Sequence, residues 1–103
     1  MPRLSILLPA LEGFDTVAAA LDAWLGQTAR DELEVLVLCP DPDTPRELPE
    51  GVRVVDSRGL DLASARARGT REAGGEYIFI AEDHCLPDAD AVALMLEAIA
   101  AGW

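Results

Sequence analysis

The chain of 103 residues contains no lysine, and all eight of its basic residues are arginine. Because 19 residues are Asp or Glu, the formal net charge is −11 at pH 7. This balance argues against general nucleic-acid binding, which needs a basic surface to displace the counterions of the phosphates. A chain without lysine also has no GxxxxGK[ST] segment, which excludes a P-loop nucleotide site.

Other signatures are missing as well. The first apolar run is not followed by GxGxxG, the pattern of dinucleotide-binding Rossmann domains, and there is no serine-centred nucleophile elbow. The two cysteines, Cys39 and Cys85, form no CxxC pair and are too few for a disulfide scaffold, so we expect two free thiols. No apolar stretch approaches the roughly 20 residues of a membrane span, and no secretory leader is recognisable. We therefore expect a cytoplasmic protein without a membrane span.

What the chain does contain is a series of short apolar runs that alternate with helical patterns. Runs typical of buried strands lie at residues 4–8, 33–39, 52–55 and 77–81, and helical patterns lie at residues 14–27, at 62–73 and after residue 90. Near-continuous apolar strands are typical of parallel sheets that are covered on both faces. The sequence thus predicts an α/β fold, a mostly parallel sheet of about four strands with helices on both faces. The length fits one domain, residues 1–103.

Polar residues gather where the fourth predicted strand ends. Glu82, Asp83 and His84, the only histidine, directly follow that apolar run. In open parallel sheets ligands bind beyond the carboxyl ends of the strands. If the alternation of a strand continues, Glu82 and His84 point the same way and can share a divalent metal ion that holds a diphosphate. A polar turn that closes the strand, with His84 bonded to the backbone, explains the same residues.

A second concentration of charge lies in the predicted helix at residues 62–73. Arg66, Arg68 and Arg71 fall within six residues of an otherwise acidic chain. A solvated helix face accounts for such a cluster. Arginine is also the residue best suited to bidentate phosphate contacts.

Taken in order, four segments resemble the amino-terminal, nucleotide-sugar-binding half of a family 2 glycosyltransferase, which has the Rossmann-like GT-A fold. LSILLP at residues 4–9 resembles the first strand of that family, VSVIIP; LDAWLGQT at 21–28 resembles its SLLxQT; ARARG at 65–69 resembles ARNxG; and GEYIFIA at 75–81 resembles GEYIxFL. In this register, residues 82–84 stand at the DxD motif of the family. The resemblance covers essentially the whole chain.

The resemblance implies a glycosyltransferase domain that binds a nucleotide-diphospho-sugar and a divalent metal, Mn²⁺ or Mg²⁺. Its implied metal ligands are Glu82 and His84. Its implied donor-binding residues are Pro9, Glu12, Asp41, Arg66 and Asp83. Of these, Arg66 matches the arginine of ARNxG, and Asp83 is expected on the opposite side of the strand end from the metal pair, against the sugar or ribose.

The chain departs from the family pattern at two other places. Ala10-Leu11-Glu12 stands where the family has Thr-Tyr-Asn. Cys39-Pro40-Asp41-Pro42 stands where it has Asp-Asp-Gly-Ser, so the acid that contacts the base is missing, with Asp41 or Asp43 as substitutes.

By the same resemblance, the half that supplies the acceptor site and the catalytic base has no counterpart in residues 1–103. We therefore expect an incomplete domain that binds a donor but is inactive in transfer by itself, with the acceptor and the base unknown. A catalytically inactive half-domain that acts as a binding or assembly module, and an unrelated flavodoxin-like or receiver-like domain, are alternatives. In the family the strand order is third, second, first, fourth, and the fourth strand is interior because a strand of the other half lies beside it. Without that half the apolar fourth strand, residues 77–81, becomes an edge, which predicts a homodimer through that strand or the last helix.

Overall fold

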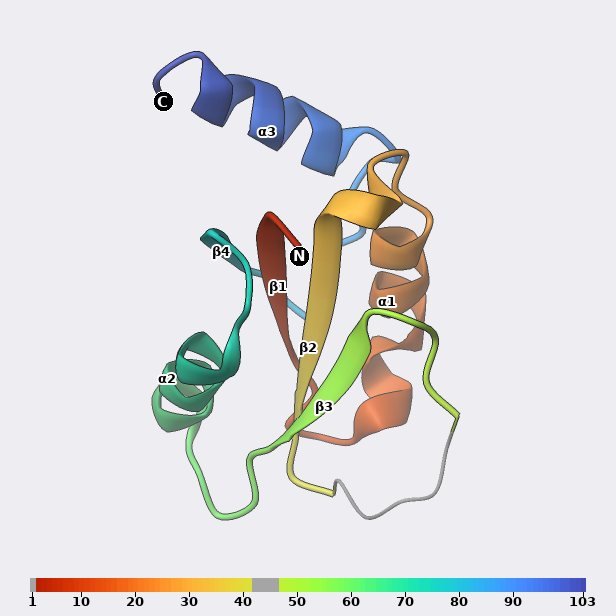
Figure 1. Ribbon diagram of the computed structural model, residues 1–103. Helices are drawn as coiled ribbons and strands as arrows, with labels where there is room; N and C mark the ends of the chain where they lie inside the picture. Colours follow the sequence, from red (N-terminus) through yellow and green to blue (C-terminus); the bar gives the residue numbers. More distant parts are fainter. Residues whose placement is uncertain (1, 42–46) are drawn as a thin grey trace.

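The computed structural model describes residues 2–41 and 47–103. Four strands form one sheet in the order β3-β2-β1-β4, and all three pairings between them are parallel (Figure 1). The strands are β1 (Leu4–Pro9), β2 (Leu33–Cys39), β3 (Val52–Asp56) and β4 (Tyr77–Ile80). The parallel sheet and the strand order are both confirmed.

Three α-helices connect or follow the strands: α1 (Ala18–Leu25), α2 (Leu62–Glu72) and α3 (Ala91–Ala100). Two short 3₁₀ helices, η1 (Phe14–Val17) and η2 (Arg30–Glu32), precede α1 and β2. The helix expected over residues 14–27 is thus divided, because Thr16 N and Thr16 Oγ1 both donate to Gly13 O, three residues back, which closes a 3₁₀ turn. Within the described ranges, every helix is too short or too polar to cross a bilayer.

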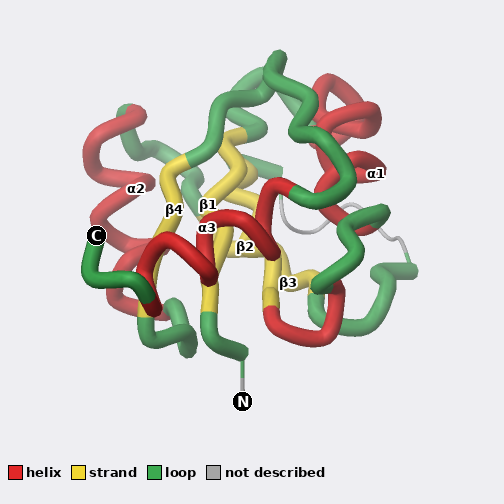
Figure 2. The backbone as a smooth tube through the Cα atoms, turned by 90° about the horizontal axis from the view of Figure 1, so that it is seen from above, coloured by secondary structure: helices red, strands yellow, loops and turns green. Residues whose placement is uncertain are grey.

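The two faces of the sheet are covered by different helices. Successive residues of a strand point to opposite faces. Ile6 and Val35, which are register partners, pack in one core cluster with residues of α1 and α3. Leu7 and Leu36 pack in a second cluster with Ala65 of α2. Figures 1 and 2 show α1 and α2 on opposite sides of the sheet, so the prediction of helices on both faces is confirmed.

Two local features set the position of α2. The Asp61 carboxylate accepts a hydrogen bond from Ser64 N at 2.8 Å and caps the start of the helix. Further along, a Cβ on Gly69 would lie 2.8 Å from Leu38 Cδ2, so a larger residue would force the buried Leu38 side chain or the helix to shift. The amino-terminal half of α2 lies beside the carboxyl end of β1, where Leu62 and Arg66 line one pocket with Pro9.

β4 lies at one edge of the sheet and is its most exposed strand. Its four side chains are between 37% and 51% exposed, whereas every residue of β1 is buried. Phe79 contacts the ring of Trp24 at a centroid distance of 5.6 Å. The expected apolar edge is therefore present.

Candidate functional site

An open pocket of about 320 Å³ lies beyond the carboxyl ends of β1 and β4. Six of the seven residues that the sequence analysis assigned to the site line it: Pro9, Glu12, Arg66, Glu82, Asp83 and His84. Leu11 and Leu62 are the other described residues that line it. The seventh residue, Asp41, is exposed after β2 and is not among the described residues that line this pocket, and Asp43 lies outside the described residues.

The acidic segment after β4 is a turn and not a continuation of the strand. β4 ends at Ile80, and a hydrogen bond from Cys85 N to Glu82 O at 3.4 Å closes the turn. Glu82 Oε2 nevertheless lies 3.3 Å from His84 Nε2. The predicted proximity of these two side chains is confirmed, but the reason given for it, strand alternation, is wrong. The turn brings them together.

Asp83 lies against the imidazole of His84. Its Oδ1 is 3.0 Å from His84 Nδ1, so the two side chains share one side of the turn, in contrast to the separation expected from strand alternation. The hydrogen bond to Asp83, followed by the charge of Glu82, raises the pKa of His84 above its ordinary value. When the ring is neutral and Nδ1–H donates to Asp83, the lone pair is at Nε2, the nitrogen beside Glu82.

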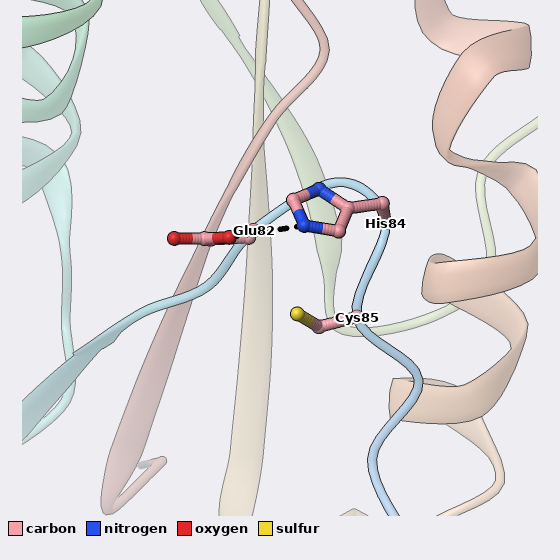
Figure 3. A group of neighbouring side chains, drawn as sticks. All are labelled: Glu82, His84 and Cys85. Atoms are coloured by element: carbon pink, nitrogen blue, oxygen red, sulfur yellow. Dashed lines mark ion pairs between the residues drawn. The ribbon is translucent and has the colours of Figure 1, made fainter.

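A third ligand-type side chain on the same turn was not assigned to the site from the sequence. This side chain belongs to Cys85. Its sulfur, one carboxylate oxygen of Glu82 and one ring nitrogen of His84 all lie within 4.8 Å of one another (Figure 3). Cys85 is exposed, Cys39 is buried, and both are free thiols, as expected. The signal for it in the sequence was the position of Cys85 directly after His84.

The geometry of this group fits a divalent cation. An imidazole nitrogen and a carboxylate oxygen that bind one ion at about 2.1 Å lie about 3.0 to 3.4 Å apart, depending on the angle at the ion. The 3.3 Å between His84 Nε2 and Glu82 Oε2 falls in this interval. Both side chains are more than half exposed, which leaves them free to adjust around an ion.

Arg66 is the arginine of the α2 cluster that reaches the pocket. Its Nε is buried and has no hydrogen-bond partner within residues 2–41 and 47–103. Arg68 instead donates to Asp56 O at 2.8 Å, and Arg71 is exposed. A buried N–H group without an acceptor costs free energy. An anion or a water molecule that accepts a hydrogen bond from Arg66 would therefore be stabilised there.

A larger pocket, of about 420 Å³, opens at the opposite end of the sheet. Its lining residues are Pro2, Arg30, Asp31, Leu33, Glu34, Glu50 and Gly51. This end lies near the start of β2, whereas open parallel sheets bind ligands beyond the carboxyl ends of their strands. The position in the fold therefore favours the pocket of about 320 Å³, beyond β1 and β4, as the functional site.

Comparison with known proteins identifies the family of the chain. No curated protein shows significant similarity to the chain. The model of the family described as "Glycosyl transferase family 2" matches residues 5–103, which is all but the first four residues. The matched region contains the α/β fold with its parallel four-stranded sheet and the pocket described above. The chain therefore belongs to glycosyl transferase family 2.

Proposed function

We propose that the pocket beyond β1 and β4 binds the diphosphate of a nucleotide-diphospho-sugar together with a divalent metal ion, as the donor site of a glycosyltransferase. The observation that supports this most is the meeting of Pro9 and Glu12 from the β1 end, Arg66 from α2 and residues 82–84 from the β4 end around one pocket. These residues are far apart in the sequence. Membership of the family supplies the reaction class.

In this proposal Glu82 and His84 would hold the ion, which neutralises the charge of the departing diphosphate when bound. Arg66 donates to a phosphate oxygen from α2 and so gives its buried Nε an acceptor. Asp83 fixes the orientation of the His84 ring through Nδ1. Each of these three roles uses a contact or an unmet hydrogen bond of the described chain.

The charges around the pocket make donor binding dependent on the ion. Among the described residues that line the pocket, Glu12, Glu82 and Asp83 contribute three carboxylates and Arg66 contributes one guanidinium. A diphosphate brought next to these groups is repelled unless a cation lies between them. We expect weak binding of nucleoside diphosphates without metal and tighter binding with it.

The first test is titration calorimetry with UDP, GDP, CDP and ADP, each with and without Mn²⁺. His84→Ala should lower the Mn²⁺-dependent affinity by about tenfold or more, the loss typical of a disturbed metal site. Arg66→Ala should weaken binding, and Arg71→Ala, on the same helix but exposed, should leave it unchanged. Equal affinities of the wild type and His84→Ala in excess Mn²⁺ would remove His84 from the site.

A second candidate function is a module that binds or assembles without transferring sugar. It is favoured by Cys39-Pro40, which stand where the family has Asp-Asp. Transfer requires a base within hydrogen-bond reach of the acceptor hydroxyl, and we assign that role to no described residue. Release of nucleoside diphosphate from a nucleotide-sugar in the presence of sugar and lipid acceptors would support transfer, whereas binding without release would support the module.

A further inference from the structure

The turn after β4 offers three different kinds of ligand atom at one point. Glu82 contributes a carboxylate oxygen, His84 an imidazole nitrogen and Cys85 a sulfur, all within 4.8 Å of one another. Mg²⁺ and Mn²⁺ prefer sites built from carboxylate, carbonyl and water oxygens. A thiolate beside an imidazole is instead suited to Zn²⁺, a borderline-soft ion that binds sulfur, nitrogen and oxygen.

We propose that Glu82, His84 and Cys85 form a three-ligand site that selects Zn²⁺ over Mn²⁺ and Mg²⁺ and leaves a fourth position open. Three protein ligands with one open position is the arrangement of zinc sites that act on a bound molecule, whereas structural zinc sites have four protein ligands. The inference rests on the proposed function for what occupies the open position, a diphosphate oxygen. The binding of the ion itself does not depend on it.

One of the three distances between ligand atoms already has the value that tetrahedral zinc requires. With bonds of about 2.0 to 2.1 Å to nitrogen and oxygen and about 2.3 Å to sulfur, the nitrogen and oxygen lie about 3.3 Å apart and the sulfur about 3.5 Å from each. His84 Nε2 and Glu82 Oε2 are already 3.3 Å apart. The Cys85 sulfur lies within 4.8 Å of both other ligand atoms, and Cys85 is exposed on the same turn.

The contact between Asp83 and His84 resembles the contact that orients metal-binding histidines. A histidine that binds zinc almost always donates its other ring N–H to a carboxylate or a carbonyl, which fixes the tautomer and the direction of the ring. Asp83 Oδ1 lies 3.0 Å from His84 Nδ1, which is the nitrogen remote from Glu82. The four consecutive residues 82–85 thus contain three ligands and the carboxylate that orients one of them.

Binding at this site must release a proton. Zinc binds the thiolate of cysteine, so the S–H bond of Cys85 breaks, its electron pair forms the bond to zinc and the proton passes to the buffer. His84 binds through its neutral ring and releases a further proton wherever it was protonated before. No oxidant or reductant takes part.

The test measures metal binding to the intact chain without any nucleotide. Competition titrations with Zn²⁺ and with Mn²⁺ should show one ion per chain and zinc bound at least tenfold more tightly than manganese. Cys85→Ser should lower the zinc affinity by about 10- to 100-fold and leave the manganese affinity little changed. The matched control is Cys39→Ala, which removes the buried thiol at the end of β2 and should bind zinc like the wild type.

Co²⁺ supplies a second measurement that does not depend on affinity. Bound in place of zinc, it should give the thiolate-to-metal charge-transfer band in the near ultraviolet, present in Cys39→Ala and absent in Cys85→Ser. Asp83→Asn should lower the zinc affinity by about tenfold while keeping this band, because Asp83 orients His84 without binding the ion. Equal zinc affinities of the wild type and Cys85→Ser, or a cobalt spectrum without the band, would overturn the proposal.

The two proposals can fail separately. Zinc selectivity that depends on Cys85, together with no binding of nucleoside diphosphates in the presence of zinc, supports the metal site and contradicts the donor site. Mn²⁺-dependent binding of nucleoside diphosphates, together with equal zinc affinities of the wild type and Cys85→Ser, supports the donor site and contradicts the zinc site.

Discussion

Ser5 and Glu34 connect three segments of the chain through single side chains. Ser5, the only polar residue of β1, is fully buried; its Oγ donates to Glu34 Oε2 at 2.6 Å and accepts from Gly75 N at 2.8 Å. Gly74 N also donates to Glu34 Oε2, at 2.6 Å. A Cβ on Gly75 would lie 2.7 Å from Ser5 Oγ, so glycine is needed for this approach. These bonds hold the segment before β4 against β1 and β2.

The Glu34 carboxylate should therefore make stability depend on pH. Partial burial raises the pKa of Glu34, but the hydrogen bonds from Ser5 and Gly74 and the charge of Arg53 outweigh burial and hold it below its ordinary value of 4.5. A lowered pKa in the folded state adds stability above pH 4.5, and this contribution is lost as the pH falls through the folded pKa. Glu34→Gln should cost about 1 to 3 kcal/mol at pH 7 and clearly less at pH 3 in urea unfolding.

The control for this prediction is Glu97→Gln, at an exposed position of α3. It removes one negative charge from a chain of net charge −11 without touching the Ser5 contacts, and so measures the effect of net charge alone. A cost of Glu34→Gln that is the same at both pH values would contradict the role given to the ionised carboxylate.

At the scale of elements, α1 and α3 are joined through one buried side chain. Gln27, just beyond the end of α1, is 4% exposed. Its Nε2 donates to Asp88 O at 2.7 Å and to Ala23 O at 3.2 Å, and its Oε1 accepts from Val92 N at 2.9 Å. The carboxamide thus satisfies an amide in the first turn of α3, which would otherwise lack a partner.

Replacing Gln27 with Leu should keep the volume but remove these bonds. Because Val92 N is then left buried without an acceptor, we expect a loss of about 1 to 3 kcal/mol in the free energy of unfolding. Hydrogen exchange of the Val92 amide should also become faster than the loss of global stability explains, because α3 opens locally. Thr28→Ala, which keeps the backbone bond from Thr28 N to Ala89 O, is the control.

At the scale of the whole molecule, one edge of the sheet is apolar and exposed. β4 carries Tyr, Ile, Phe and Ile, and Leu94 of α3 is 54% exposed. An edge strand without charge or proline pairs readily with another chain, whereas a net charge of −11 opposes unspecific aggregation. Self-association through β4 or α3 stays a prediction, with a dimer expected in sedimentation at micromolar concentration.

Two variants separate the two possible contacts. Ile80→Lys places a charge on the edge strand, and Leu94→Lys places one on the exposed side of α3. The variant that shifts the sedimentation coefficient to that of the monomer identifies the surface. A wild-type chain that remains monomeric throughout, with slowly exchanging amides in β4, would contradict the prediction.

The sequence by itself determined the type and order of the elements, because their signals are local. Apolar runs of strand length and the apolar stripe of α1 depend on neighbouring residues only, and each predicted strand is present within one residue at either end. The resemblance to glycosyl transferase family 2 added the strand order, which local pattern does not contain. It also pointed to the residues of the pocket, six of which lie together.

Only the tertiary structure decided how the side chains of the site are arranged. Strand periodicity holds while the backbone is extended, and it fails at residues 82–85 because the bond from Cys85 N to Glu82 O closes a turn there. That turn brings Cys85 beside His84 and sets Asp83 against the ring, neither of which spacing along a strand predicts. The contacts of Ser5 with Gly75 and of Gln27 with Val92 join residues more than 60 positions apart. Contacts of this kind depend on how the elements pack, and the order of residues does not reveal them.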